Sequence, residues 1–187
     1  MSLFYIRRRS VFVAGTALLG AVVAVLDLGV RLKIPFPLLP YLKFDVLGIP
    51  MLLSSFLFGF FSGSITSLVA WLSISTRDWF SGFMKFAAEF STMMGVYVVL
   101  RARSPSNAWW KALAMISGVF VRVIVMAVAN IALLPVFYAT LYKTYDAVIV
   151  LIPLISLFNA IQGAVSVFGG FIVYEAVVLR LHSLKHE

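Results

Sequence analysis

The chain has 187 residues, of which 63% are hydrophobic and 12% are charged, whereas an ordinary soluble domain is about 45–50% apolar and about 25% charged. This composition excludes a soluble globular enzyme, a disordered chain and a soluble nucleic-acid binder, and the absence of cysteine excludes a disulfide framework and thiolate metal sites. The net charge of +8 is therefore interpreted as a sign of membrane topology, and the length suits one integral membrane domain of about five or six spans.

The first predicted transmembrane span covers about residues 11–30 and follows three arginines, Arg7 to Arg9. A spanning helix needs about 20 predominantly apolar residues, and the run from Ser10 to Leu26 carries no charge. This run is longer than the apolar part of a signal peptide, and no small-residue cleavage site ends it. We therefore expect an anchor that is retained in the protein.

Residues 31–45 are predicted to form a loop. Pro35, Pro37 and Pro40 exclude a regular helix there. The segment is also apolar and aromatic, so we expect it to pack on the protein rather than to extend into water.

Residues 46–76 contain no charged side chain. As one helix they would be about 46 Å long, whereas the hydrocarbon core of a bilayer is about 30 Å thick. The segment from Phe58 to Gly63 offers a break, because it places two glycines in an aromatic run. Two short spans are therefore predicted, at about 46–59 and 62–76.

Three longer spans complete the prediction, at about 81–100, 109–138 and 147–179. Lysine and arginine lie close to the helix ends on the side that carries both termini, which places this side in the cytoplasm. The expected fold is an all-α integral membrane protein of the cell membrane, with six transmembrane helices in one domain, residues 1–187, and both termini cytoplasmic.

The sequence contains no motif of catalysis. It has no phosphate-binding loop, no zinc-protease helix motif and no serine-hydrolase motif. The only histidines, His182 and His186, lie in the tail, and two ligands are too few for a metal site. We therefore predict no enzymatic activity, no catalytic residue, no cofactor, no metal site and no nucleic-acid partner, and we expect membrane lipid around the chain.

Polar side chains inside the predicted spans are the candidate functional residues, because polar groups are costly in a bilayer. They are Glu89, Arg122, Asn130, Asn159 and Gln162. At a helical rise of about 1.5 Å per residue, three helices present a carboxylate or an amide to the outer half of the membrane. The pattern predicts a polar-lined pocket that opens to the outside.

These polar residues also have structural explanations. The amides can join helices through hydrogen bonds worth roughly 0.6 kcal/mol on average, and Glu89 can simply pair with Arg122. Three further charged residues lie near span ends, so their charged groups are expected to reach water; they are Asp27, Lys85 and Glu175.

Small residues in the first span give a second signal. Ala17 and Ala21 lie on one helical face, as do Gly20 and Ala24, and this spacing lets another helix approach closely. The approaching helix belongs either to this protein or to a partner protein.

Several short motifs resemble those of the substrate-binding S components of energy-coupling factor (ECF) vitamin transporters, and most of all those of the riboflavin-specific members. Ala17 and Ala21 match the A-x-x-x-A motif of that family's first helix. The other similar segments are Leu42-Lys43-Phe44-Asp45 with Ile49-Pro50, Phe58 to Gly63, Asn130 with Leu134-Pro135-x-x-Tyr138, and Phe158 to Gly163. The similarity extends over nearly the whole chain.

The resemblance implies an S-component-like bundle that binds riboflavin from outside and delivers it inward with a transmembrane coupling subunit and two ATPase subunits. Residues 31–45 would close over the occupied site, and Ala17 and Ala21 would dock on the coupling subunit. The implied substrate-binding residues are Leu42, Lys43, Asp45, Glu89, Asn130, Asn159 and Gln162.

Three positions depart from the family pattern. The lysine of the family's sixth helix is Gln162 here, the polar residue of its fourth helix, commonly asparagine, is Glu89, and Arg122 has no counterpart. Two alternatives stay open for this reason. One is an S component for another vitamin or precursor, such as pantothenate, a pyrimidine or a thiamine-like cation that pairs with Glu89. The other is a structural membrane scaffold that binds no vitamin.

Riboflavin also suits these residues chemically. The edge of its ring system alternates acceptors with an N–H donor, and a carboxamide offers both kinds of group, so Asn130 and Asn159 match it. Its ring faces need apolar or aromatic walls, which the 17 phenylalanines of the chain can supply.

Overall fold

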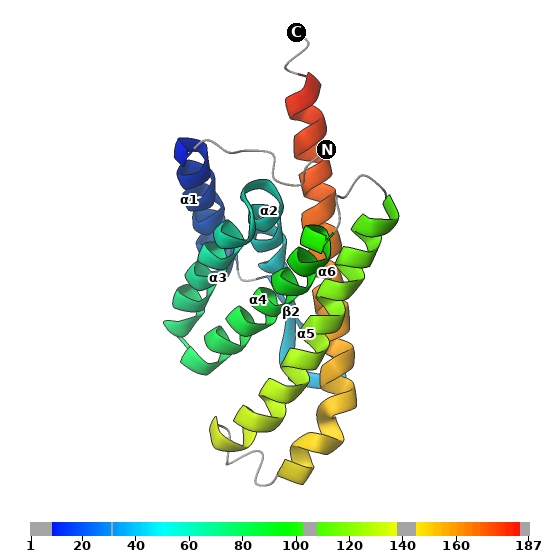
Figure 1. Cartoon of the computed structure of the whole chain (residues 1–187). Helices are drawn as coiled ribbons and strands as arrows, with labels where there is room; N and C mark the ends of the chain where they lie inside the picture. The colour runs from blue at the N-terminus through cyan, green and yellow to red at the C-terminus, as the bar shows by residue number, and fades with distance from the viewer. Residues whose placement is uncertain (1–8, 31, 103–107, 138–144, 184–187) are drawn as a thin grey trace.

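The computed structural model describes residues 9–30, 32–102, 108–137 and 145–183. Six helices and one two-stranded sheet make up this part of the chain (Figure 1). Predictions that concern Arg7, Arg8, Tyr138 and the histidine side chains fall outside what the structure describes. The elements are α1 (Arg9–Val25), a π-turn that continues it (Leu26–Val30), β1 (Lys33–Phe36), β2 (Leu39–Asp45), α2 (Gly48–Phe58), α3 (Phe60–Ser75), α4 (Trp79–Ala102), α5 (Ala108–Phe137) and α6 (Tyr145–Ser183).

Each of the six predicted spans coincides with one helix, which confirms the expected helical fold. Four of the helices are long and apolar enough to cross a membrane, namely α1 with its π-turn, α4, α5 and α6. The other two, α2 and α3, are shorter apolar helices. In Figure 1 the longest helix, α6, runs from the lower end of the molecule to its upper end, beside α5 in the lower half.

The predicted break between the second and third spans lies at Gly59. Its φ is 98°, a backbone conformation that glycine adopts without steric cost. The N–H of Gly59 donates to the carbonyl of Ser55 at 2.9 Å and closes α2, and α3 begins at the next residue, Phe60. One glycine therefore replaces the loop that would otherwise separate two helices.

Small and hydroxyl-bearing residues let the first three helices pack closely. The Oγ of Ser62 on α3 lies 2.6 Å from Thr16 Oγ1 on α1 and 2.6 Å from Ser54 Oγ on α2. All three side chains are buried and are bonded across the helices, and Thr16 also donates to the carbonyl of Phe12 on its own helix at 2.7 Å. Next to them, a Cβ on Gly63 would lie 2.7 Å from the Cβ of Ser55 on α2, so a larger residue would force the two helices apart.

The segment predicted as a loop forms an antiparallel hairpin of β1 and β2, so that prediction was wrong about its local structure. In the register of the hairpin, Lys33 pairs with Asp45 and Pro35 with Lys43. The prolines do exclude a helix. Each strand of a two-stranded sheet has a free edge, however, and a residue without an N–H is tolerated at such an edge.

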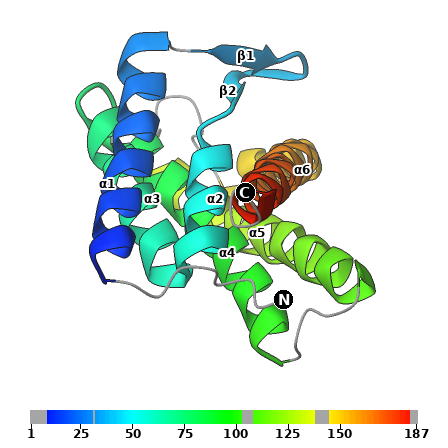
Figure 2. The same ribbon diagram turned by 90° about the horizontal axis from the view of Figure 1, so that it is seen from above.

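The expectation that this segment packs on the protein is confirmed. The rings of Phe36 and Phe44 lie against the ring of Phe158 on α6, with centroid distances of 5.7 and 4.8 Å. Figure 2 shows the hairpin reaching from the end of α1 toward α6 along one side of the bundle. The hairpin is thus anchored at α6 by aromatic packing.

Two apolar clusters frame the centre of the molecule. One joins α2, α4, α5 and α6 and includes Leu52, Met93 and Val167. The other joins the hairpin to α4, α5 and α6 and includes Phe80 and Leu134. Along each of α4, α5 and α6, buried polar residues lie between the residues of the two clusters, and this polar layer positions the candidate site.

Candidate functional site

A cavity of about 770 Å³ lies between the hairpin, the turn that joins α3 to α4, and helices α4, α5 and α6. Ligand pockets in proteins are typically about 300–1,000 Å³, mostly apolar, with a few placed polar groups. The apolar and aromatic part of the lining is formed by Pro40, Tyr41, Leu42, Ile74, Phe80, Met84, Ala88, Met126, Leu134 and Phe158. The size and the lining are those of a small-molecule site.

The predicted substrate-binding residues converge on this cavity. Asn130 on α5, and Asn159 and Gln162 on α6, belong to its lining, although they come from distant parts of the sequence. Strand β2 contributes three more of the predicted residues, Leu42, Lys43 and Asp45. The remaining one, Glu89, does not line the cavity and lies fully buried beside it.

Glu89 is held by donors from three helices. Its Oε1 accepts hydrogen bonds from Arg122 Nη1 on α5 at 2.9 Å and from Ser166 Oγ on α6 at 3.3 Å. The Nζ of Lys85, one turn earlier on α4, lies 3.1 Å from the same oxygen. The predicted pairing of Glu89 with Arg122 is thus confirmed. The carboxylate is neutralised within the protein and is not left for a cationic ligand.

Arg122 also fixes one of the two lining asparagines. Its Nε donates to Asn159 Oδ1 at 3.3 Å, and Asn159 Nδ2 donates to the carbonyl of Ile155 at 2.9 Å. Asn130 Nδ2 similarly donates to the carbonyl of Met126, one turn earlier on α5, at 2.6 Å. An amide nitrogen carries two hydrogens and an amide oxygen two lone pairs, so Asn159 is oriented without exhausting its capacity to bind a ligand.

Gln162 is bonded to the hairpin. Its Nε2 donates to the carbonyl of Asp45 at 2.9 Å, and its Oε1 accepts from the N–H of Asp45 at 3.2 Å. The carboxylate of Asp45 in turn accepts from Lys85 Nζ at 2.7 Å. A continuous polar network therefore runs from the end of β2 through α4 to α5 and α6.

Two charged residues expected to reach water form ion pairs inside the protein instead, and for them the prediction was wrong. Lys85 is paired with Asp45 and Glu89 as described, and the side chain of Asp27 is 0% exposed. Asp27 accepts from Lys33 Nζ at 3.2 Å, from Ser73 Oγ at 2.9 Å and from Arg77 Nη2 at 2.5 Å. The two cations, Lys33 and Arg77, belong to connecting segments, and the prediction of the spans did not specify where these segments lie.

The third such residue, Glu175, is closer to expectation. Its side chain is 36% exposed and pairs with Lys111 Nζ at 2.7 Å. It therefore lies at a boundary with solvent, but in an ion pair between α5 and α6.

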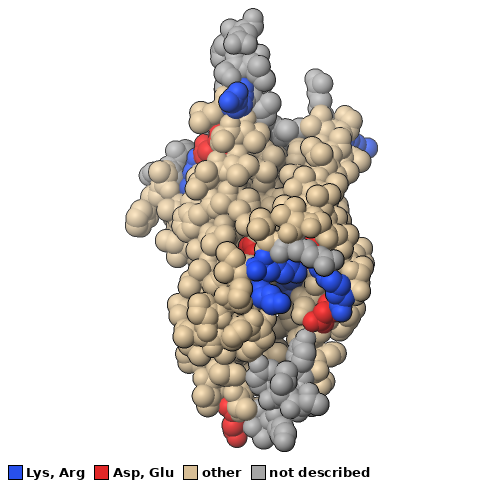
Figure 3. All heavy atoms as spheres, turned by 180° about the vertical axis from the view of Figure 1, so that it is seen from behind, with Lys and Arg blue, Asp and Glu red and all other residues tan. Residues whose placement is uncertain are grey.

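The mouth of the cavity is basic. Lys33, Lys43 and Arg77 belong to its lining, and Figure 3 shows basic side chains gathered beside a hollow on an otherwise largely uncharged face. Lys33 and Arg77 are paired with Asp27, while Lys43 is exposed and has no ion pair within the described residues. The entrance therefore carries more cations than anions, although two of its three cations are paired with Asp27, and Asp78 also belongs to its lining.

The small residues of α1 divide between two faces. Gly15 and Gly20 face the bundle, where a Cβ on Gly15 would collide with the ring of Phe58. Ala17 and Ala21 are exposed on the outer surface of α1. The glycines thus serve internal packing, and the alanine pair is left accessible to another helix.

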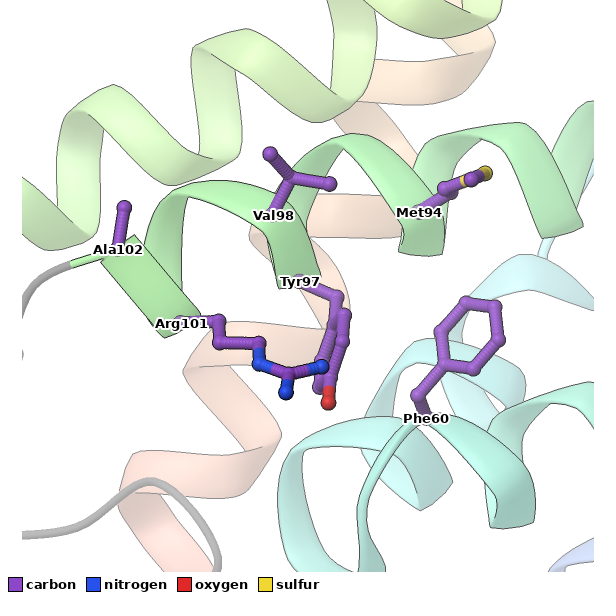
Figure 4. Close-up of a pocket in the computed structure, with 6 residues that line it drawn as sticks. All are labelled: Phe60, Met94, Tyr97, Val98, Arg101 and Ala102. Atoms are coloured by element: carbon purple, nitrogen blue, oxygen red, sulfur yellow. The ribbon is translucent and has the colours of Figure 1, made fainter.

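A second hollow, of about 410 Å³, lies between α3 and α4 (Figure 4). It is lined by Phe60, Met94, Tyr97, Val98, Arg101 and Ala102 and contains none of the predicted site residues. Within the described ranges no group of three or more His, Cys, Asp or Glu side chains could hold a metal ion. The predicted polar groups that could bind a ligand therefore lie at the cavity of about 770 Å³.

No protein-family model matches the sequence, and no curated protein sequence matches it either. The structure, however, is similar to that of the S component of a bacterial ECF transporter, with a TM-score of 0.76 and 25% sequence identity. The match covers 93% of this chain and 99% of that chain. By this structural match the chain has the fold of an ECF transporter S component, and its long apolar helices are those of a multi-pass membrane protein.

Proposed function

We propose that the chain is a riboflavin-binding S component that captures the vitamin outside the cell. It would deliver riboflavin inward together with a transmembrane coupling subunit and two ATPase subunits. The observation that carries this proposal is the cavity of about 770 Å³, in which two asparagine side chains meet an apolar and aromatic lining.

The lining supports a flat, mostly apolar ligand with one polar edge. Phe80, Phe158 and Leu134 offer surfaces for ring faces, while Asn130 and Asn159 offer amide donors and acceptors. Riboflavin combines these features, because its ring edge alternates acceptors with an N–H donor. Leu42, Lys43 and Asp45 are proposed to complete the site from β2, and Glu89 from behind it.

The charges argue against the thiamine-like alternative. A cationic ligand was attractive only if Glu89 presented an uncompensated carboxylate to the pocket. Arg122 Nη1 and Lys85 Nζ lie 2.9 and 3.1 Å from its Oε1, and Glu89 does not line the cavity. A neutral vitamin such as riboflavin is therefore favoured over a cationic one.

The exposed alanine face of α1 supports docking to a coupling subunit. Ala17 and Ala21 have small side chains on an accessible helix surface, which lets a partner helix approach closely in lipid. The π-turn connects this helix to the mouth of the cavity through Asp27, whose partners Lys33 and Arg77 belong to the lining. We propose that docking uses the outer face of α1 and that substrate capture involves the π-turn at its end.

The direct test is to purify the protein in detergent, record its visible absorbance, and titrate it with riboflavin while following flavin fluorescence. A yellow protein, or stoichiometric quenching, is the expected result. A colourless protein without quenching would exclude riboflavin, and a panel of other vitamins, with pantothenate and pyrimidine precursors included, would then identify the substrate.

A further inference from the structure

The amide of Gln162 pairs with both backbone groups of a single hairpin residue. It donates to the carbonyl of Asp45 at 2.9 Å and accepts from its N–H at 3.2 Å, and the side chain is 1% exposed. A neighbouring β-strand pairs a residue in the same way. Gln162 thus continues the sheet by one residue and joins it to α6.

Asp45 is the point at which the hairpin is tied to the bundle. Its Oδ1 accepts from Lys85 Nζ on α4 at 2.7 Å and from the N–H of Leu47 at 3.0 Å. Together with the two bonds to Gln162, these contacts connect the end of β2 to α4, to α6 and to the start of α2. Releasing Asp45 would free one end of the hairpin.

The hairpin forms one wall of the cavity through Pro40, Tyr41, Leu42 and Lys43. A movement of this wall would open the cavity to the outside. We propose that Gln162 is a positioning residue, a latch that holds the hairpin against the bundle and sets how often the cavity opens, instead of reading the ligand. This inference rests on the proposed function in so far as the cavity receives a substrate.

The chemistry of the amide explains why glutamine occupies this position. A lysine could donate to the Asp45 carbonyl, but it would offer no acceptor to the Asp45 N–H. It would also add a cation to a region that already contains Lys85 and Arg122. A glutamine satisfies both backbone groups and adds no charge.

The latch is tested without any ligand by hydrogen–deuterium exchange of the full-length protein in nanodiscs. Gln162→Met keeps the size of the side chain and removes both bonds, so exchange at residues 33–45 should rise about tenfold, while exchange in α4 and α5 stays as in the wild type. Gln162→Asn, which is too short to reach, should act in the same direction. Unchanged hairpin exchange in both variants would overturn the latch.

Ser166→Ala is the matched control. Ser166 lies one turn further along α6, is equally buried, and bonds to Glu89 instead of the hairpin. Its variant should leave hairpin exchange at the wild-type rate. An equal rise in this control would show a general loosening of α6 and would also overturn the latch.

Binding kinetics distinguish the latch from a ligand contact. With riboflavin as the probe, Gln162→Met should raise the dissociation rate about tenfold without slowing association, and the spectrum of the bound flavin should not change. A changed spectrum would indicate that Gln162 contacts the bound flavin directly and would contradict the latch. If wild-type protein binds no riboflavin, the proposed substrate fails, but the exchange experiment still decides on the latch.

Discussion

At Glu89, donors from three side chains meet one carboxylate oxygen in a place that water does not reach. The other oxygen, Oε2, finds no hydrogen-bond partner among the described residues. Removing one member of a buried charge pair costs about 3–5 kcal/mol, because the remaining charge stays buried and uncompensated. The network should therefore be sensitive to the loss of a single charge.

We expect Glu89→Gln to be the most destabilising single change in this network. It leaves Arg122 without its carboxylate, whereas Arg122→Met leaves Glu89 with Lys85. The double variant should be more stable than Glu89→Gln alone, since both charges are then removed. Thermal unfolding of the ligand-free protein in detergent measures this, and additive losses in the double variant would contradict the coupling.

Asn159→Ala should weaken riboflavin binding by about 1–3 kcal/mol, because a polar edge of the ligand would lose its partner inside the protein. The measurement is a fluorescence titration. Thr66→Val is the control, since Thr66 is buried on α3, bonds to the carbonyl of Gly63 and does not line the cavity. Unchanged affinity in Asn159→Ala would remove this amide from the proposed site.

The sequence was sufficient to identify the polar residues of the network, but it was not sufficient to predict their interaction partners. Glu89, Arg122 and Asn159 were predictable, because polar groups inside apolar spans are costly and need a reason. The ion pair of Lys85 with Asp45 was not predictable. Its partner Asp45 lies 40 residues away, in a hairpin whose position depends on the tertiary fold.

Among the elements, α1 carries the clearest division of roles. Its glycines face the bundle and its alanine pair faces outward. Ala17→Trp should therefore block assembly with the coupling subunit and leave riboflavin affinity unchanged. Co-purification and titration measure the two effects.

Ile116→Trp, at an exposed position of α5, is the control for a bulky residue on a lipid-accessible surface and should permit assembly. Assembly of the Ala17 variant at the wild-type level would contradict docking at this face. Loss of riboflavin binding in that variant would contradict the separation of docking from capture.

The elements also show where sequence patterns reach their limit. Hydropathy and glycine placement were sufficient for the helices, including the break at Gly59, because span length and backbone freedom are local properties. The hairpin was not predicted, because its strands are stabilised by pairing with each other and by packing on Phe158 of α6, and such contacts are not visible in a local sequence pattern. Only the exclusion of a helix was visible in the prolines of that segment.

For the molecule as a whole, the predicted orientation can be tested because the chain contains no cysteine. Single cysteines can therefore be introduced without background labelling of native cysteines. Lys43→Cys on the hairpin and Tyr145→Cys at the start of α6 should react with a membrane-impermeant maleimide added to intact cells. Ala102→Cys, at the end of α4, should react only after lysis. The opposite pattern would place both termini outside.

The charges of α4 have a consequence for how the protein enters the bilayer during synthesis. The helix α4 is less apolar than α5, because it carries Lys85 and Glu89. An unpaired charge at the centre of a helix costs about 2.5–3.5 kcal/mol on insertion. Glu89 can pair with Lys85, one turn earlier on α4, but the buried site also needs Arg122, which emerges only with the next helix. The insertion machinery is therefore expected to hold α4 until α5 arrives and to release the two into lipid as a pair.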